Sequence, residues 1–194
     1  LVARPPQVVL SVGFAGALKP EFSTGDIVVS RQASTVQLPN RLHTLDSDFS
    51  QTALKALQDA GLKASSGNVL TVPKPLVTEY DKQAHGLQTK ASIADMESYW
   101  IVQECLLMNV PIASIRVILD EMSHELPDLV SSITADNGEH EWRHAIRAML
   151  KPTSASSLLP LAIRSRKATM AIKAAIRAVI PALTKDAPLR AVYR

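Results

Sequence analysis

The sequence predicts an α/β protein with three layers, αβα, in which a mixed and largely parallel central sheet lies between helices and C-terminal helices follow. Three observations predict this fold: short apolar runs bounded by turn residues in the first 120 residues, a strand–helix–strand unit over 91–119, and helical patterns alone after Pro127. Apolar runs that alternate with amphipathic helices are typical of α/β folds. We expect residues 1–150 to form one α/β domain and residues 151–194 to form a basic amphipathic helical extension of the same domain.

The first part of the chain predicts three strands and one helix. Val8–Val12 is a short β-branched run, which predicts a buried strand, and the glycines of Gly13–Gly16 predict a tight loop after it. Ile27–Ser30 predicts a second strand and Gly67–Val72 a third. Asp48–Ala60 has the apolar spacing of a helix and precedes a glycine, which is a common helix stop.

The clearest unit is a strand, a helix and a strand in the second half of the domain. It follows a short predicted helix over Tyr80–Lys90. The unit comprises a strand over Ala91–Asp95, a helix over Glu97–Met108 and a strand over Ile112–Leu119. A connection of this length is typical of a βαβ unit, so we expect the two strands to be parallel. Their carboxyl ends should then meet at one edge of the sheet.

The C-terminal part predicts helices. Leu129–Leu150 and Ser157–Leu183 both have helical apolar spacing, and we expect the second helix to be broken or kinked at Pro160. Basic residues of this second helix lie beside apolar ones; they are Arg164, Arg166, Lys167, Lys173 and Arg177. One interpretation is peripheral contact with an anionic membrane surface. The other is an ordinary amphipathic helix that packs on the domain or on a partner subunit.

Composition argues against several classes of protein. A net charge of +3 with three Phe, two Trp and three Tyr is low for a nucleic-acid binder, so we expect no nucleic-acid partner. The single cysteine, Cys105, allows neither a disulfide within this sequence nor a cysteine zinc cluster, and it fits a reducing cytoplasm. No run reaches the roughly 18 apolar residues of a membrane span. His140 and His144 are spaced for a metal, but a solvated helix face is the favoured interpretation, so we expect no metal site.

Acidic side chains gather at the predicted ends of two strands. Asp95 and Glu97 follow one strand, and Asp120 ends the next. Ligands of parallel α/β sheets bind at the carboxyl ends of the strands, which makes these residues a candidate site. A simpler alternative is that Asp95 and Glu97 cap the following helix, where its dipole favours an acid, and that Asp120 begins a loop.

Four segments occur in the order found in nucleoside phosphorylases and nucleosidases. They are Gly13–Leu18, Gly25–Val29, Asp95–Ser98 and Arg116–Asp120. The sequence therefore resembles the nucleoside phosphorylase/nucleosidase superfamily, of the purine and uridine phosphorylase type, over most of residues 8–120. Within it the sequence is most similar to the hopanoid-associated phosphorylase-like branch, because of Leu126-Pro127 and the basic helical tail that begins near Lys151-Pro152.

The resemblance implies a nucleoside site and assigns roles in it. Asp120 would give or share a proton with the base, which is general acid catalysis, while Glu97 would hold the ribose hydroxyls and Met96 would pack against the sugar. The other residues that the resemblance places at the substrate are Asp95, Phe14, Ala15, Gly16 and Leu76. The implied reaction is cleavage of the N-glycosidic bond of a purine, adenosine-type nucleoside, including one joined to a hopanoid such as adenosylhopane. The resemblance implies no cofactor, phosphate as a candidate co-substrate, and a homo-oligomer.

Three departures from the family pattern bear on this reading. Phe14 stands where phosphate-using members usually carry a small hydroxyl residue, and Leu119 replaces a small polar residue before the acid. Both changes weaken the case for phosphate and leave hydrolysis and phosphorolysis open. The family's first strand has no counterpart in Leu1–Gln7, so we expect the sequence to be incomplete at its N-terminus. The alternative function is a non-catalytic nucleoside-binding or structural relative.

Overall fold

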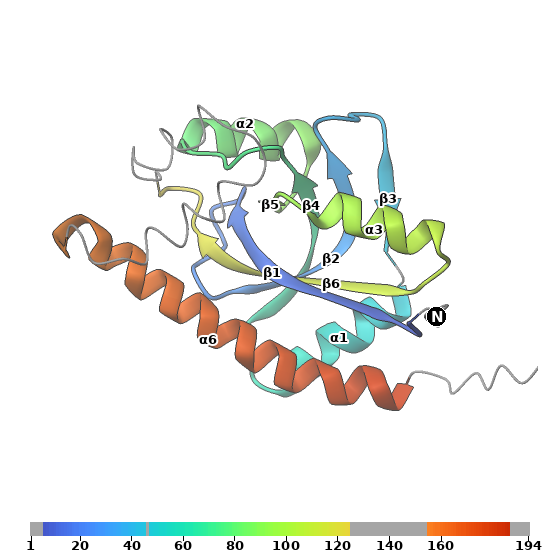
Figure 1. The fold of residues 1–194 in the computed structure, drawn as a ribbon. Helices are drawn as coiled ribbons and strands as arrows, with labels where there is room; N and C mark the ends of the chain where they lie inside the picture. The colour runs from blue at the N-terminus through green and yellow to red at the C-terminus, as the bar shows by residue number, and fades with distance from the viewer. Residues whose placement is uncertain (1–5, 46, 125–154, 187–194) are drawn as a thin grey trace, which may run out of the picture.

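The computed structural model describes residues 6–45, 47–124 and 155–186, which form an α/β fold around one curved sheet (Figure 1). The elements are β1 (Val9–Ala17), β2 (Ile27–Thr35), β3 (Leu42–Thr44), α1 (Ser47–Asp59), β4 (Ala64–Thr71), α2 (Glu79–Thr89), β5 (Ile93–Asp95), α3 (Ser98–Leu107), β6 (Ile112–Asp120) and α6 (Ala155–Asp186). The predicted helix over Leu129–Leu150 lies outside the described residues.

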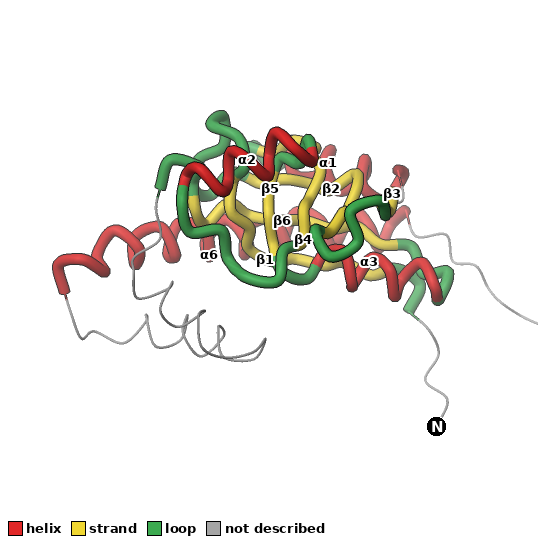
Figure 2. The backbone as a smooth tube through the Cα atoms, turned by 90° about the horizontal axis from the view of Figure 1, so that it is seen from above, coloured by secondary structure: helices red, strands yellow, loops and turns green. Residues whose placement is uncertain are grey.

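The sheet is mixed and closes on itself. Its strand order is β3-β2-β4-β5-β1-β6, and a further pairing joins β2 to β6. The β1–β6, β2–β4 and β4–β5 pairs are parallel, whereas the β1–β5, β2–β3 and β2–β6 pairs are antiparallel. Figure 2 shows the strands wrapped into a curved sheet with the helices around it. The predicted mixed α/β fold is confirmed.

Helices cover both faces of the sheet, which gives the three predicted layers (Figure 1). On one face, α3 contributes Val102 and Cys105 to a core shared with β1 and β6. On the other face, α1 and α6 pack together over β2 and β6, and α6 buries Ala168, Ala175 and Val179 there. Burial of these apolar surfaces is what holds the helices on the sheet.

The predicted parallel pairing of β5 and β6 is wrong. The strand β1 lies between them, parallel to β6 and antiparallel to β5, so β5 and β6 run in opposite directions. The helix α3 connects them as predicted, but it does not form a parallel βαβ unit. Strand pairing depends on contacts between distant segments. The local sequence of β5 and β6 therefore does not predict that β1 lies between them.

The expected loop over Gly13–Gly16 is also absent, because β1 continues through these residues to Ala17. The two glycines lie beside charged side chains of β6 rather than in a turn. A Cβ atom on Gly13 would lie 3.6 Å from the guanidinium carbon of Arg116, and one on Gly16 would lie 3.8 Å from Oδ2 of Asp120. These are ordinary van der Waals distances, so the charged side chains of β6 lie directly against this part of β1.

One edge of β1 is open. Residues from Val9 to Gly16 pair with β6 on one side, but on the other side only Gly16 and Ala17 pair with β5. Within the part of the chain that the structure describes, no strand lies along this second side between Val9 and Ala15. The strand is accordingly only half-buried over Val9–Gly13, whereas β6 is buried along nearly its whole length.

The helix α6 runs from Ala155 to Asp186 without the break expected at Pro160. Pro160 lies in the second turn, so the missing amide removes one hydrogen bond near a helix end rather than in the packed middle. The buried residues of α6 face α1 and the sheet, while Arg166, Lys167 and Lys173 are exposed. None of the helices in the described ranges combines the length and the apolar character needed to cross a bilayer.

Candidate active site

The middle strand β1 brings the ends of β5 and β6 together. In the register of the sheet, Gly16 faces Asp120 of β6 on one side and Ala94 of β5 on the other. Two strand spacings separate these neighbours, about 10 Å between backbones. Asp95 and Asp120 thus lie at a similar level of the sheet on either side of β1, but their strands run in opposite directions. The expected meeting of two parallel carboxyl ends is not found, and a site shared by the two acids stays a prediction.

Asp120 is a buried carboxylate held by a buried lysine. Nζ of Lys82 on α2 donates to Oδ2 of Asp120 at 2.5 Å, and the two side chains are 2% and 13% exposed. Burial raises the pKa of the Asp120 carboxyl above its ordinary value. The charge and hydrogen bond of Lys82, and more weakly the charges of His124 and Arg164, lower this pKa in part without reversing the direction. The carboxyl therefore retains a proton at higher pH than an exposed aspartate.

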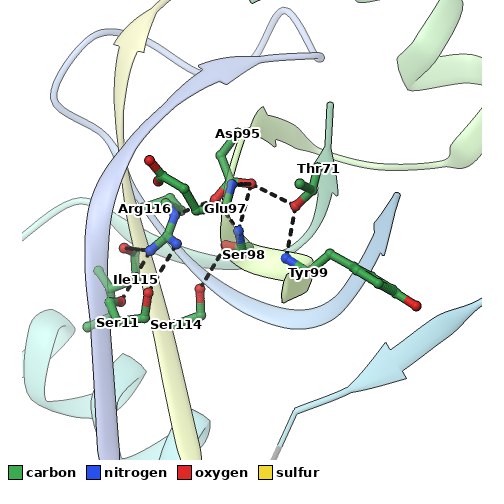
Figure 3. Close-up of polar contacts among 9 residues, drawn as sticks. All are labelled: Ser11, Thr71, Asp95, Glu97, Ser98, Tyr99, Ser114, Ile115 and Arg116. Carbon is green, nitrogen blue, oxygen red and sulfur yellow. Dashed lines mark hydrogen bonds and ion pairs between the residues drawn. The ribbon is translucent and has the colours of Figure 1, made fainter. Parts of the chain in front are cut away.

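Asp95 lies in an internal network that joins β5 to three other elements, β4, α3 and β6 (Figure 3). Its Oδ1 accepts hydrogen bonds from the Thr71 hydroxyl at 2.9 Å and from the backbone N–H of Ser98 at 3.1 Å. Its Oδ2 accepts from Nε of Arg116 at 2.6 Å, and both charged side chains are 1% exposed. Asp95 thus satisfies an otherwise free N–H at the start of α3, as the capping alternative predicts, and it also pairs with a buried cation.

Arg116 holds Asp95 in place, and the sequence analysis assigned it no role of its own. Besides pairing with Asp95, its guanidinium donates to the carbonyl of Ser11 at 3.3 Å, the hydroxyl of Ser11 at 3.1 Å and the carbonyl of Ile115 at 3.0 Å. The signal was available, because an arginine inside a strand of buried residues needs a buried acceptor. Lys82 was missed as well, and the polar sequence around it gives no comparable signal.

Met96 and Glu97 form the turn between β5 and α3. Both are half-buried, and the Asp95 network fixes the backbone on either side of them. The backbone N–H of Glu97 lies 3.3 Å from Oδ1 of Asp95. Asp95 is therefore placed to orient the two residues that the resemblance assigns to the ribose, and its own contact with substrate stays a prediction.

The remaining predicted residues lie on β1 and after β4. Phe14 is 40% exposed and Ala15 is buried. Gly16 lies between the two strand ends described above. Leu76 packs against a cluster that contains Leu18 and Ala94. The structure therefore places Gly16 beside Asp120 and Leu76 near the end of β5, while the assignment of all four to substrate remains untested.

No group of three potential metal-ligating acids, histidines or cysteines occurs among the described residues. His140 and His144 lie outside those residues. The thiol of Cys105 is buried, and burial raises its pKa, as is typical of a structural cysteine.

Comparison with known structures gives several matches to nucleosidases. A mutant futalosine hydrolase of Helicobacter pylori is 18% identical with a TM-score of 0.56, and the match covers 65% of this chain and 62% of that one. The 5′-methylthioadenosine/S-adenosylhomocysteine nucleosidase of Campylobacter jejuni is 17% identical with a TM-score of 0.57, covering 88% and 69%. A mutant of the H. pylori nucleosidase with 5′-methylthioadenosine in its active site is 14% identical with a TM-score of 0.59, covering 88% and 68%.

These matches establish a shared fold, and the chain spans 62% to 69% of the lengths of the three structures. No curated protein matches the sequence. The family model of the phosphorylase superfamily matches residues 1–151, which is most of the chain. The protein therefore belongs to the phosphorylase superfamily.

Proposed function

We propose that this protein cleaves the N-glycosidic bond of a purine, adenosine-type nucleoside, with Asp120 as the acid that protonates the leaving base. The observation that carries the proposal is the buried carboxyl of Asp120, whose pKa is raised, across Gly16 from the strand that leads into Met96 and Glu97. The fold shared with nucleosidases, one of them with 5′-methylthioadenosine in its active site, supports the same reaction class.

The chemistry of the bond explains why these side chains suit it. Cleavage builds positive charge on the ribose, as in other glycosyl transfers, and the purine leaves readily only when it is protonated. A carboxyl whose pKa is raised by burial keeps its proton to higher pH than an exposed aspartate, which suits a general acid. The carboxylate of Glu97 would bind ribose hydroxyls, and Met96 would pack on the sugar. Asp95 would hold Met96 and Glu97 in position, because its carboxylate accepts hydrogen bonds from the backbone N–H groups of Glu97 and Ser98.

Water is the nucleophile that the site favours. Phe14 has no hydrogen-bond donor or acceptor on its side chain, so it cannot hold phosphate as a hydroxyl residue would. Phosphorolysis remains the second form of the reaction, with phosphate as co-substrate.

The finer features of the function belong to the same proposal. The proposed substrates are small nucleosides and nucleosides joined to a hopanoid lipid. With a lipid-linked substrate, the exposed basic residues of α6 would contact an anionic membrane surface. The protein would act in the cytoplasm as a homo-oligomer, without a cofactor or metal.

The decisive experiment measures adenine release from adenosine and 5′-methylthioadenosine, with and without phosphate. Release that does not depend on phosphate supports hydrolysis, and release only with phosphate supports phosphorolysis. Calorimetry with the same compounds tests the second candidate, a nucleoside-binding relative without activity, which Phe14 at the nucleophile position favours. Tight binding with no release of base would replace the enzymatic proposal by this one.

Replacement of Glu97 by glutamine is expected to raise KM for the nucleoside by about 10-fold to 100-fold, since hydrogen bonds to charged groups contribute about 1.5–3 kcal/mol. Binding of free adenine should change little, because the base does not carry the ribose hydroxyls. Steady-state kinetics and adenine calorimetry measure the two effects. Glu104→Gln, on the exposed side of α3, is the matched control and should leave both unchanged. Equal weakening of nucleoside and free base would contradict the assigned ribose contact.

A further inference from the structure

Lys82 of α2 is a buried cation with no role in the function described so far. Its side chain is 2% exposed, and Nζ lies 2.5 Å from Oδ2 of Asp120. We propose that Lys82 is a positioning residue for the reaction: it holds one oxygen of Asp120 so that the other oxygen faces the leaving base. This inference rests on the proposed function.

The hydrogen bonds of Lys82 match what an ammonium group requires. Nζ donates to Asp120 at 2.5 Å, to the carbonyl of Glu121 at 3.0 Å and to the carbonyl of His124 at 2.5 Å. An ammonium has three donors, so all of them have an acceptor. The two carbonyls belong to the segment that follows β6 directly. One side chain of α2 thus fixes both the carboxylate and the backbone after it.

The start of α2 holds Lys82 in place. The Thr78 hydroxyl accepts a hydrogen bond from the backbone N–H of Asp81 at 3.0 Å, which caps the helix. The backbone N–H of Lys82 donates to the Thr78 carbonyl at 3.2 Å, in the first turn of α2. A buried lysine is costly unless it is paired, so this side chain has little freedom to leave Asp120.

The arrangement leaves the second oxygen of Asp120 for another partner. Among residues 6–45, 47–124 and 155–186, no donor forms a hydrogen bond with Oδ1 of Asp120. Gly16 of β1 lies directly beside the carboxylate, since a Cβ there would be in van der Waals contact with Oδ2 at 3.8 Å. Because Lys82 holds Oδ2 by a hydrogen bond, Oδ1 is fixed in one orientation. Proton transfer to a ring nitrogen requires such a fixed orientation.

Lys82 also limits how far burial changes the acidity of Asp120. Burial raises the pKa of the carboxyl, and Lys82 is the strongest opposing influence, followed by the charges of His124 and Arg164. Glu121, next in sequence, directs its carboxylate to the N–H and hydroxyl of Thr24 at 2.9 Å and 3.0 Å. Removal of the Lys82 charge should therefore raise the pKa of Asp120 further. An acid must be protonated to act, so the alkaline limit of activity should move to higher pH.

The test compares the full chain with its Lys82→Met and Lys82→Arg variants. We expect Lys82→Met to lower the maximal kcat on adenosine at least tenfold and to move the alkaline limb of kcat/KM upward by about one pH unit, the shift of a tenfold change in proton affinity. Lys82→Arg keeps the charge and should leave the limb near that of the native protein. Lys55→Met, whose partner Asp59 is exposed, is the control and should change neither quantity.

A second measurement does not depend on turnover. Carbon-13 NMR of labelled aspartate carboxyls, assigned with Asp120→Asn, reports the titration of Asp120 in each variant. A higher midpoint in Lys82→Met shows that Lys82 controls the acidity of Asp120 even if the native protein releases no base. The absence of base release would overturn the proposed function, and with it the part of Lys82 in catalysis. An unmoved Asp120 titration and an unmoved pH limb would overturn the role of Lys82, whatever the loss of stability. If Lys82→Met does not fold, Lys82→Gln, which keeps a hydrogen-bond donor and removes the charge, takes its place, and the midpoint of Asp120 in that variant must lie above the native midpoint.

Discussion

Asparagine at position 120 is expected to lower kcat/KM for release of purine base by about 10²-fold to 10⁴-fold, the range that a general acid contributes. Asparagine has the shape of the carboxyl and can still accept the hydrogen bond of Lys82 through its amide oxygen, so the fold should survive. What it lacks is an acidic proton to give to the base. Steady-state kinetics over the pH range measure the effect.

The control for this variant is Asp59→Asn, an exposed aspartate in an i,i+4 pair with Lys55 on α1. It removes the same charge from an exposed ion pair on α1 and should leave the rate unchanged. Circular dichroism and calorimetry check that Asp120→Asn binds the nucleoside and remains folded. A rate equal to that of the native protein would remove Asp120 from the mechanism. Retained binding with lost turnover is the outcome that the proposed role requires.

The second large effect concerns stability. Arg116→Met is expected to lower the free energy of unfolding by about 3–5 kcal/mol, because it leaves the carboxylate of Asp95 buried without its cation. Both side chains are 1% exposed, so solvent cannot replace the lost partner. In a chain of this size the loss corresponds to a decrease in Tm of about 6–20 °C. Thermal and urea unfolding measure it.

The matched control is Lys55→Met, which breaks an exposed ion pair and should change stability by less than about 1 kcal/mol. The double variant Arg116→Met with Asp95→Asn removes both buried charges, and it should recover part of the loss. Unfolding energies that simply add, or a cost for Arg116→Met no larger than that of Lys55→Met, would show that the pair does not anchor the sheet. Because Asp95 also holds the backbone around Glu97, Arg116→Met should weaken nucleoside binding as well.

Local signals in the sequence predicted most helices and strands, but not how the strands pair. Short β-branched runs and the glycine after α1 are properties of neighbouring residues, so the sequence alone located β2, β4 and α1 to within a few residues. The place of β1 between β5 and β6 depends on contacts about 100 residues apart. The glycine pattern of Gly13–Gly16 indicates a turn when it is taken alone, but this segment is a strand in the structure because it pairs with the distant strand β6.

In the candidate site, too, local sequence identified the acids but did not predict their partners. Asp120 could be singled out because it ends a strand, and Asp95 because it precedes a helix. The partners that determine what these acids do come from distant elements: Lys82 lies 38 residues before Asp120, and Arg116 lies 21 residues after Asp95. Their pairing distinguishes the proposed general acid, Asp120, from Asp95, which supports the start of α3. Only the folded arrangement contains that information.

Among the described residues, the side of β1 away from β6 has no strand partner along Val9–Ala15. A strand edge of this kind is the feature to which an extended peptide adds in β-augmentation. Ser11 lies on this edge, and its carbonyl and hydroxyl also bind the guanidinium of Arg116. A strand that docks there would lie beside the residue that holds Asp95 and, through it, the Glu97 turn. A strand bound along this edge would therefore be linked to the backbone around Glu97 through Ser11, Arg116 and Asp95.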